Sequence, residues 1–124
     1  RSVVSNNIAH NNGNRGFNFL SCRDVVVSGN EAVDNYQKRT DSTEAFGFHF
    51  ESNGPNAPPN RRLTITGNIA RRNRPVGNQL EGFALHPARI EDSTFVANIS
   101  SGHQRNILIG EPMHNVSVIG NVDA

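Results

Sequence analysis

One short pattern recurs five times in this chain: a β-branched run that ends in a small or polar residue followed by asparagine. Val25-Val26-Val27-Ser28-Gly29-Asn30 is the clearest copy. The five asparagines, 23, 38, 30 and 23 residues apart, are Asn7, Asn30, Asn68, Asn98 and Asn121. Such a repeat constrains the fold strongly, because one unit cannot bury its own apolar face and must stack on its neighbours.

A second strand-like segment follows each of the first four asparagines, after a polar turn residue. The turn residues are Asn12, Asn35, Asn73 and His103. The segments are Gly16–Phe19, Gly47–Phe50, Gly82–Leu85 and Asn106–Ile109. Apolar residues alternate with others in these segments, which is the period of a strand with one buried face. We therefore expect their apolar positions to stack in one core.

The repeat predicts an all-β fold, a right-handed parallel β-helix (solenoid) of about five coils. The core unit is about 23 residues, and residues 1–124 form a single β-helix segment in this interpretation. The longer intervals carry loop insertions, which we place at 36–44, 52–60 and 74–79. A β-sandwich is the alternative, but sandwich turns do not repeat one asparagine position five times.

Asparagine suits the corner of each coil for two reasons. It tolerates a left-handed backbone better than most residues. Its amide can also hydrogen-bond to the equivalent amide of the next coil, about 4.8 Å away. Neither end of the chain resembles a cap, so we expect the rest of a longer β-helix, or other subunits, to cover the ends.

Composition argues against two classes of partner. The net charge of +1 provides no basic field for nucleic acid, and no apolar run is long enough to span a membrane. Cys22 is the only cysteine and cannot form an internal disulfide. The sequence therefore predicts no nucleic-acid or membrane partner, and cysteine usage leaves the compartment open.

Stacking of the second strands places side chains of different coils in outward columns. One column holds Asn18, His49, Ala84 and Leu108, the next holds Leu20, Glu51, His86 and Gly110, and the column before the glycines holds Arg15, Phe46, Glu81 and Arg105. Because residues two apart share a face of a strand, Glu51 is expected beside His49. His86 falls one coil away from Glu51.

These residue types suit acid–base chemistry on an acidic sugar. A carboxylate can hold an imidazole in one tautomer and raise its basicity. Arginines can neutralise the dianionic enolate that forms when a proton α to a uronate carboxyl is abstracted, which leads to epimerisation or elimination. The predicted catalytic residues are His49, Glu51 and Arg15, and the predicted substrate-binding residues are Asn14, Asn18, His86, Glu81 and Arg105.

Simpler interpretations stay open. Outward histidines and glutamates on a β-helix often serve solubility and pairing between coils. A metal site formed by His49, Glu51 and His86 would match no specific ligand spacing. We therefore predict no metal site and no cofactor, and the sequence does not decide whether calcium is required.

The run Asn6–Phe19, followed by Asp24–Asn30, resembles the repeats of secreted mannuronan C5-epimerases. That resemblance implies a right-handed β-helix that acts on alginate. The proline-bearing insertion before Leu63 and the strand at Glu81 fall where the family has comparable features. The family's Asp-Pro-His-Glu motif does not occur in the chain and would by register precede residue 1. Where the family has an Arg-His pair, the chain has Asn14-Arg15.

The resemblance implies an extracellular or cell-surface protein that binds or processes an acidic polysaccharide, as a uronate C5-epimerase or a lyase. Polysaccharide lyases and viral spike proteins share such coils. A non-catalytic β-helix module of a phage tailspike, fibre or surface adhesin is therefore the alternative. An ice- or mineral-binding solenoid is disfavoured, because the outward columns lack a regular threonine array.

Overall fold

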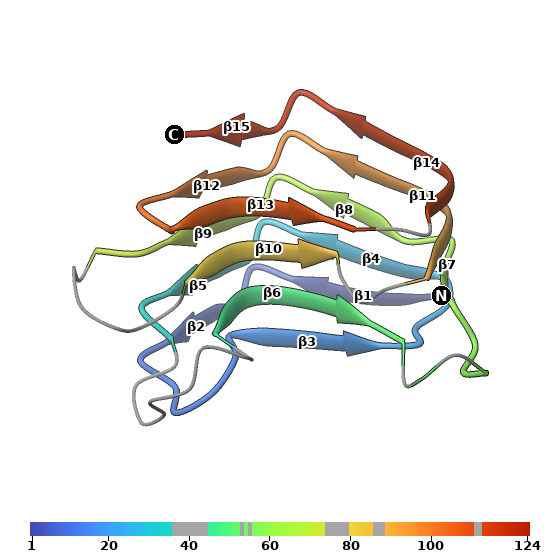
Figure 1. The fold of residues 1–124 in the computed structure, drawn as a ribbon, viewed down its shortest axis with the longest axis horizontal. Helices are drawn as coiled ribbons and strands as arrows, with labels where there is room; N and C mark the ends of the chain where they lie inside the picture. The colour runs from blue at the N-terminus through green and yellow to red at the C-terminus, as the bar shows by residue number, and fades with distance from the viewer. Residues whose placement is uncertain (36–44, 53, 55, 74–79, 86–88, 111–112) are drawn as a thin grey trace.

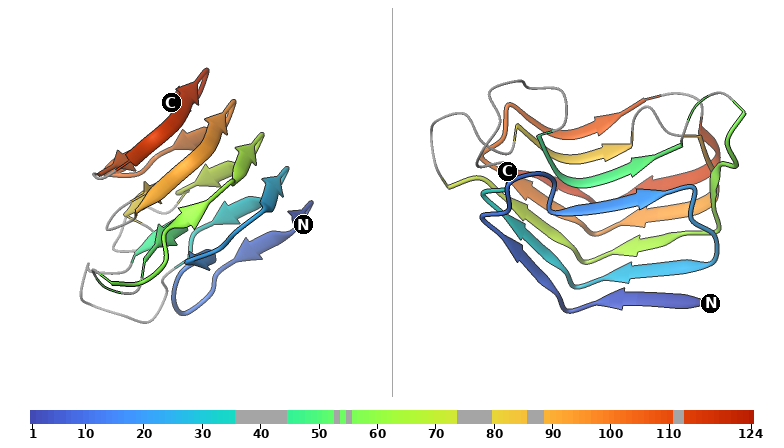
Figure 2. Two further views of the ribbon diagram at one scale, coloured as in Figure 1. Left: turned by 90° about the vertical axis from the view of Figure 1, so that its right-hand side faces the viewer. Right: turned by 90° about the horizontal axis from the view of Figure 1, so that it is seen from below.

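The computed structural model describes residues 1–35, 45–52, 54, 56–73, 80–85, 89–110 and 113–124. These residues form fifteen strands and no helix, and thus no helix that could cross a membrane. The strands lie in three sheets in which all pairings are parallel (Figures 1 and 2). Successive strands along the chain enter the three sheets in turn, which is consistent with a parallel β-helix or solenoid.

The sheets are named here A, B and C. Sheet A contains β1 (Ser2–Ser5), β4 (Val25–Ser28), β8 (Thr64–Thr66), β11 (Ile90–Val96) and β14 (Met113–Ile119), with β7 (Asn60–Arg61) paired to β11. Sheet B contains β2 (Ile8–His10), β5 (Glu31–Val33), β9 (Ile69–Arg71), β12 (Ile99–Ser101) and β15 (Val122–Asp123). Sheet C contains β3 (Phe17–Leu20), β6 (Phe46–Glu51), β10 (Glu81–Leu85) and β13 (Arg105–Ile109).

The asparagine ladder between sheets A and B is confirmed. Oδ1 of the fully buried Asn68 accepts hydrogen bonds from the backbone N–H and the side-chain Nδ2 of Asn30, both at 3.0 Å. Asn68 Nδ2 donates to Asn98 Oδ1 and to Val27 O, both at 2.9 Å. The same amide-to-amide bonds continue to both ends of the ladder. Each rung therefore ties its own coil to the coils on either side.

We expected the ladder asparagine to be the left-handed residue at this corner. The left-handed residue is instead the one before it. In every coil its φ lies between 56° and 63°, at Asn6, Gly29, Gly67, Ala97 and Gly120. One residue thus turns the chain, and the next aims its amide along the stacking axis. The other four positions hold glycine or asparagine, which tolerate this conformation. Ala97 has a Cβ and no polar side chain, and its Cβ disfavours the left-handed conformation.

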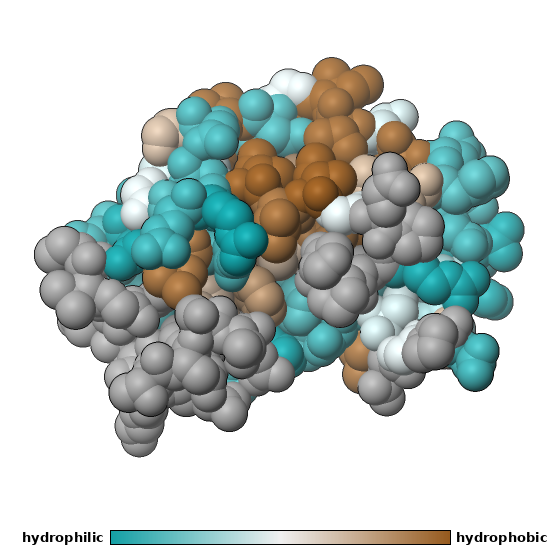
Figure 3. All heavy atoms as spheres, viewed as in Figure 1, coloured by the Kyte–Doolittle hydropathy of each residue, from teal (hydrophilic) through white to brown (hydrophobic). Residues whose placement is uncertain are grey.

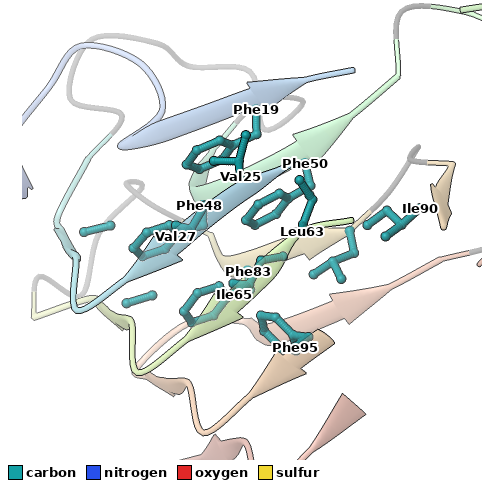
Figure 4. Packing of buried hydrophobic residues seen from close by; sticks show 13 residues of the cluster. Phe19, Val25, Val27, Phe48, Phe50, Leu63, Ile65, Phe83, Ile90 and Phe95 are labelled. Carbon is teal, nitrogen blue, oxygen red and sulfur yellow. The ribbon is translucent and has the colours of Figure 1, made fainter. Parts of the chain in front are cut away.

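The core lies between the sheets, where phenylalanine rings of sheet C stack one above another (Figure 4). The ring centroids of Phe17 and Phe48 are 4.8 Å apart and those of Phe48 and Phe83 are 4.7 Å apart, nearly parallel in both pairs. This spacing equals the distance between neighbouring strands, so the register itself produces the stack. Phe95 of sheet A meets Phe83 edge-on at 5.3 Å.

Glycine precedes phenylalanine in sheet C because the backbone there is pressed against sheet B. A Cβ on Gly82 would overlap Ser100 Oγ and lie 2.6 Å from Asn106 O. The open side of this glycine therefore points into the molecule. Phe83, the next residue, also packs in the core, so regular alternation is interrupted between Gly82 and Phe83. Glu81 lies on the side away from Gly82, as does its register partner Phe46, whose ring packs on that of His49.

The predicted insertions at 36–44 and 74–79 lie outside the described residues, as do residues 53 and 55 of the third. Within 52–60, residues 52, 54 and 56–59 form no strand, and β7 begins at the last residue, Asn60. Asn60 Oδ1 accepts the backbone N–H of Cys22 at 2.8 Å. This asparagine therefore adds a further amide link between coils.

Replacing Asn68 by alanine is expected to lower the free energy of unfolding by about 3 kcal/mol, because buried partners in two neighbouring coils would lose their hydrogen bonds. Asn121→Ala is the matched control at the partly buried outer rung, with an expected loss of about 1 kcal/mol. Urea unfolding followed by circular dichroism measures both. Equal losses would contradict the idea that burial sets the contribution of a rung.

Ala97→Gly is expected to stabilise the protein by about 1 kcal/mol, because glycine relieves the strain of a left-handed alanine. The reverse change, Gly67→Ala, is expected to cost about the same. No atom lies within 4 Å of a Cβ built on Gly67, so this loss reports backbone strain alone. Thermal and urea unfolding test the pair, and a destabilised Ala97→Gly variant would refute the assignment of strain.

Candidate functional site

Four of the predicted site residues meet on the outer face of β3 and β6. Glu51 Oε1 accepts hydrogen bonds from Arg15 Nη1 at 3.3 Å and from Asn18 Nδ2 at 3.0 Å. Glu51 Oε2 lies 3.8 Å from His49 Nδ1. The register pairs Asn18 with His49, and Leu20 with Glu51, as predicted. We call Arg15, Asn18, His49 and Glu51 the Glu51 cluster.

The prediction of an open polar groove required His49 to lie on a solvated surface, and this is wrong. Its side chain is 2% exposed, and its ring packs on that of Phe46 with a centroid distance of 4.2 Å. All of β10 and all of β6 except Glu51 are buried, so both faces of these strands are covered. Strand alternation identified the side on which His49 lies, but it carried no information on whether that side is covered.

Glu81 and Arg105 form a second ion pair, between register partners on β10 and β13. The side chain of Glu81 is 1% exposed and that of Arg105 is 61% exposed. Glu81 Oε1 accepts a hydrogen bond from Arg105 Nη2. Glu81 Oε2 is buried and has no hydrogen-bond partner among the described residues. On the other side of Glu81, its register partner is Phe46.

The remaining predicted residues are not brought into the Glu51 cluster. Asn14 is exposed, and its Oδ1 accepts the backbone N–H of Arg15 at 2.9 Å. His86 lies outside the described residues, so its predicted place beside Glu51 stays a prediction. In the described part of the chain, no three His, Cys, Asp or Glu side chains are grouped as a metal ion would require.

His103 is the centre of a polar cluster that was predicted only as a turn position. Its Nδ1 lies 3.2 Å from Ser100 Oγ and 3.1 Å from Asn106 Oδ1. Asn106 Nδ2 also donates a hydrogen bond to Asp123. Burial lowers the pKa of His103 from 6.5 to about 4. Ser100 is fully buried, and the bond from Asn106 to Asp123 links the cluster to the next coil. The signal in the sequence was a histidine in a column of asparagines.

A second corner, in the first part of sheet A and within β11 and β14, carries charged side chains in place of an amide ladder. Its left-handed residues, with φ between 49° and 56°, are Asp24, Arg62, Asp92 and Asn115. Arg62 binds Asp24 through two hydrogen bonds of 2.6 and 2.8 Å, and the pKa of the Asp24 carboxyl is lowered by the bond to this guanidinium. Asn115 Nδ2 donates to Asp92 at 2.9 Å.

A hollow of about 250 Å³ lies beside this charged corner, on sheet A and away from the Glu51 cluster. It is lined by Arg1, Asp24, Val25, Val26, Arg62 and Thr64. Because Arg62 and Asp24 neutralise each other across it, we assign it no function. The Glu51 cluster and the Glu81–Arg105 pair are therefore the candidate site.

No protein-family model, curated protein or solved structure matches this chain. The resemblance to mannuronan C5-epimerases therefore rests on the sequence motifs alone.

Lowering the pH from 7.5 to 5 is expected to cost about 2 kcal/mol of stability through His103. The pKa of His103 is about 4 in the folded chain, whereas the ordinary pKa of histidine, used here for the unfolded chain, is 6.5. The folded state therefore disfavours the protonated imidazole. The contribution is complete above pH 6.5 and is lost as the pH falls toward 4. His103→Asn, which introduces the residue of the other coils, should remove this part of the pH dependence in urea unfolding. An unchanged pH profile would show that His103 is not responsible.

Proposed function

We propose that this chain forms a right-handed parallel β-helix that binds an acidic polysaccharide along the outer face of sheet C. The Glu51 cluster carries the proposal, because it joins a guanidinium, an amide, an imidazole and a carboxylate from two adjacent coils. These polar groups stand on neighbouring strands about 4.8 Å apart, which suits an elongated ligand with repeated polar groups. Toward β13 the same face becomes apolar (Figure 3). With such a ligand, we propose that the protein acts outside the cell or at the cell surface.

The acidic character of the ligand is inferred from the arginines. Arg105, Glu81 and Phe46 are successive register partners and so share an outward column. The backbone N–H of Gly16 donates to Phe46 O, so the residue before Gly16, Arg15, is next in this column. The two arginines are then three coils apart, or about 14 Å. Guanidinium groups bind carboxylates in a bidentate manner, so each arginine offers a position for one uronate carboxyl. Without a ligand, Arg15 is paired with Glu51 and Arg105 with Glu81.

Proton transfer is the second part of the proposal. Glu51 would orient the imidazole of His49 so that the ring serves as the base that abstracts the proton α to a uronate carboxyl. Arg15 would neutralise the enolate. The enolate then either takes a proton from water on its opposite face, which gives the epimer, or expels the glycosidic oxygen β to the carboxyl, which takes the proton held by His49 and gives the unsaturated product. Binding needs only Arg15, Asn18 and Glu51. Catalysis needs in addition that the ligand reaches the buried ring of His49.

Arg15→Ala is expected to weaken the binding of an acidic oligosaccharide by about tenfold, or about 1.4 kcal/mol. Arg71→Ala is the matched control, because Arg71 pairs with Glu31 at 3.3 Å, as Arg15 pairs with Glu51 at 3.3 Å, but lies on sheet B. Isothermal titration with oligomannuronate and oligogalacturonate measures both variants.

Equal affinities of parent and Arg15→Ala would remove the Glu51 cluster from the binding site. Failure of the parent to bind either oligosaccharide would favour the alternative, a β-helix module of a fibre, tailspike or adhesin. That alternative is supported by the continuous amide ladder, which provides the rigidity that a shaft needs.

A further inference from the structure

The Glu81–Arg105 pair combines an exposed cation with a buried anion. Arg105, at the first position of β13, presents most of its side chain to solvent, whereas Glu81 beneath it is almost fully buried. A ligand can therefore reach the guanidinium without reaching the carboxylate. The carboxylate cannot follow the guanidinium outward, because its strand is paired on both sides and its backbone N–H is bound to Ala45 O at 3.0 Å.

The two oxygens of the Glu81 carboxylate have different surroundings. Oε1 is held by Arg105, and Oε2 is buried without a hydrogen-bond partner among the described residues. A buried carboxylate carries a high desolvation cost, which the neighbouring cation offsets. If that cation is taken away, the ionised form of Glu81 loses its main source of stabilisation.

We propose that Arg105 and Glu81 form a proton-coupled carboxylate site: an acidic ligand displaces Glu81 from Arg105, and Glu81 takes up one proton from solvent. The ligand carboxylate stays ionised and forms the new ion pair with the guanidinium. Charge balances, since one anion replaces another at Arg105 and the displaced anion becomes neutral. The proposal rests on the proposed function for the identity of the ligand, a chain of uronates.

The charged and titratable groups around Glu81 are few in the described part of the chain. From β13 the group is Arg105, the register partner. From β6 the titratable side chains are His49 and Glu51, and Phe46 stands between this pair and Glu81 in the register. His49 packs on the ring of Phe46, and Glu51 is held by Arg15 and Asn18. From sheet B, which also packs against β10, the charged side chain on β9 is Arg71, and it pairs with Glu31. Among the described residues, Arg105 is therefore the cation on which the ionised form of Glu81 depends.

The Arg15–Glu51 pair does not share this behaviour. The side chains of Arg15 and Glu51 are both partly exposed, and Glu51 accepts a further hydrogen bond from Asn18. Loss of Arg15 to a ligand would leave Glu51 with that amide and with access to water. One proton per bound chain is therefore expected, and it is taken up at Glu81.

Linkage gives the direction of the pH effect. The complex binds one proton more than the free protein, so affinity rises as the pH falls, by at most about tenfold per pH unit. Isothermal titration of the full chain with oligogalacturonate, in two buffers of the same pH and different ionisation enthalpy, counts the protons directly. The parent should take up about one proton per ligand. Glu81→Gln should bind without proton uptake, and Glu31→Gln on sheet B should behave as the parent.

A second measurement tests the site without any ligand. In Arg105→Ala the counter-ion of Glu81 is absent, as it is in the proposed complex. The carboxyl carbon of Glu81 in a ¹³C spectrum at pH 7 should then show the protonated form, and that of the parent the ionised form. Glu81 is identified by the signal that is lost in Glu81→Gln.

The outcomes separate the two proposals. Binding by the parent without proton uptake, or with uptake that survives in Glu81→Gln, overturns the proton-coupled site and leaves the proposed function standing. Absence of binding removes the proposed function, and the ¹³C spectrum then decides the coupling by itself. An ionised Glu81 in Arg105→Ala overturns the coupling in every case.

Discussion

Each coil of this protein is fixed to the next by a side-chain amide whose donor and acceptor both point along the stacking axis. The amide Oδ1 satisfies two donors of the preceding coil, and Nδ2 donates to the next amide and to a strand carbonyl. Buried polar groups are stable only when such bonds are complete. The ladder thus sets the strand register, and the register sets which outward side chains become neighbours.

Most of this framework follows from the sequence, because it depends on local rules applied five times. The asparagine spacing predicted the ladder, and the Gly-Phe segments predicted the register that pairs Asn18 with His49 and Glu81 with Arg105. The structure adds the reason for the glycine: the side of Gly82 that lacks a Cβ faces Ser100 of another sheet. A repeated pattern makes distant residues predictable, since each coil repeats the geometry of the last.

Other features depend on contacts that alternation does not encode. Alternation placed His49 on the outer side of β6, yet the ring is buried against Phe46. Both faces of a strand in a parallel sheet are often covered, so an outward side chain is not thereby an exposed one. The left-handed positions were also missed at Ala97 and Arg62, because alanine and arginine are not residue types that indicate a positive φ.

The contrast between the two kinds of corner bears on how the coils find their order during folding. Identical asparagines are interchangeable, so a ladder of amides alone would accept a coil docked in the wrong place. The charged corner is not interchangeable: Asp24 meets Arg62, and the next residue of the column is Asp92. Skipping one coil would set Asp24 against Asp92, two like charges in contact. The charged corner thus favours the correct order of coils that the amide ladder alone would not distinguish.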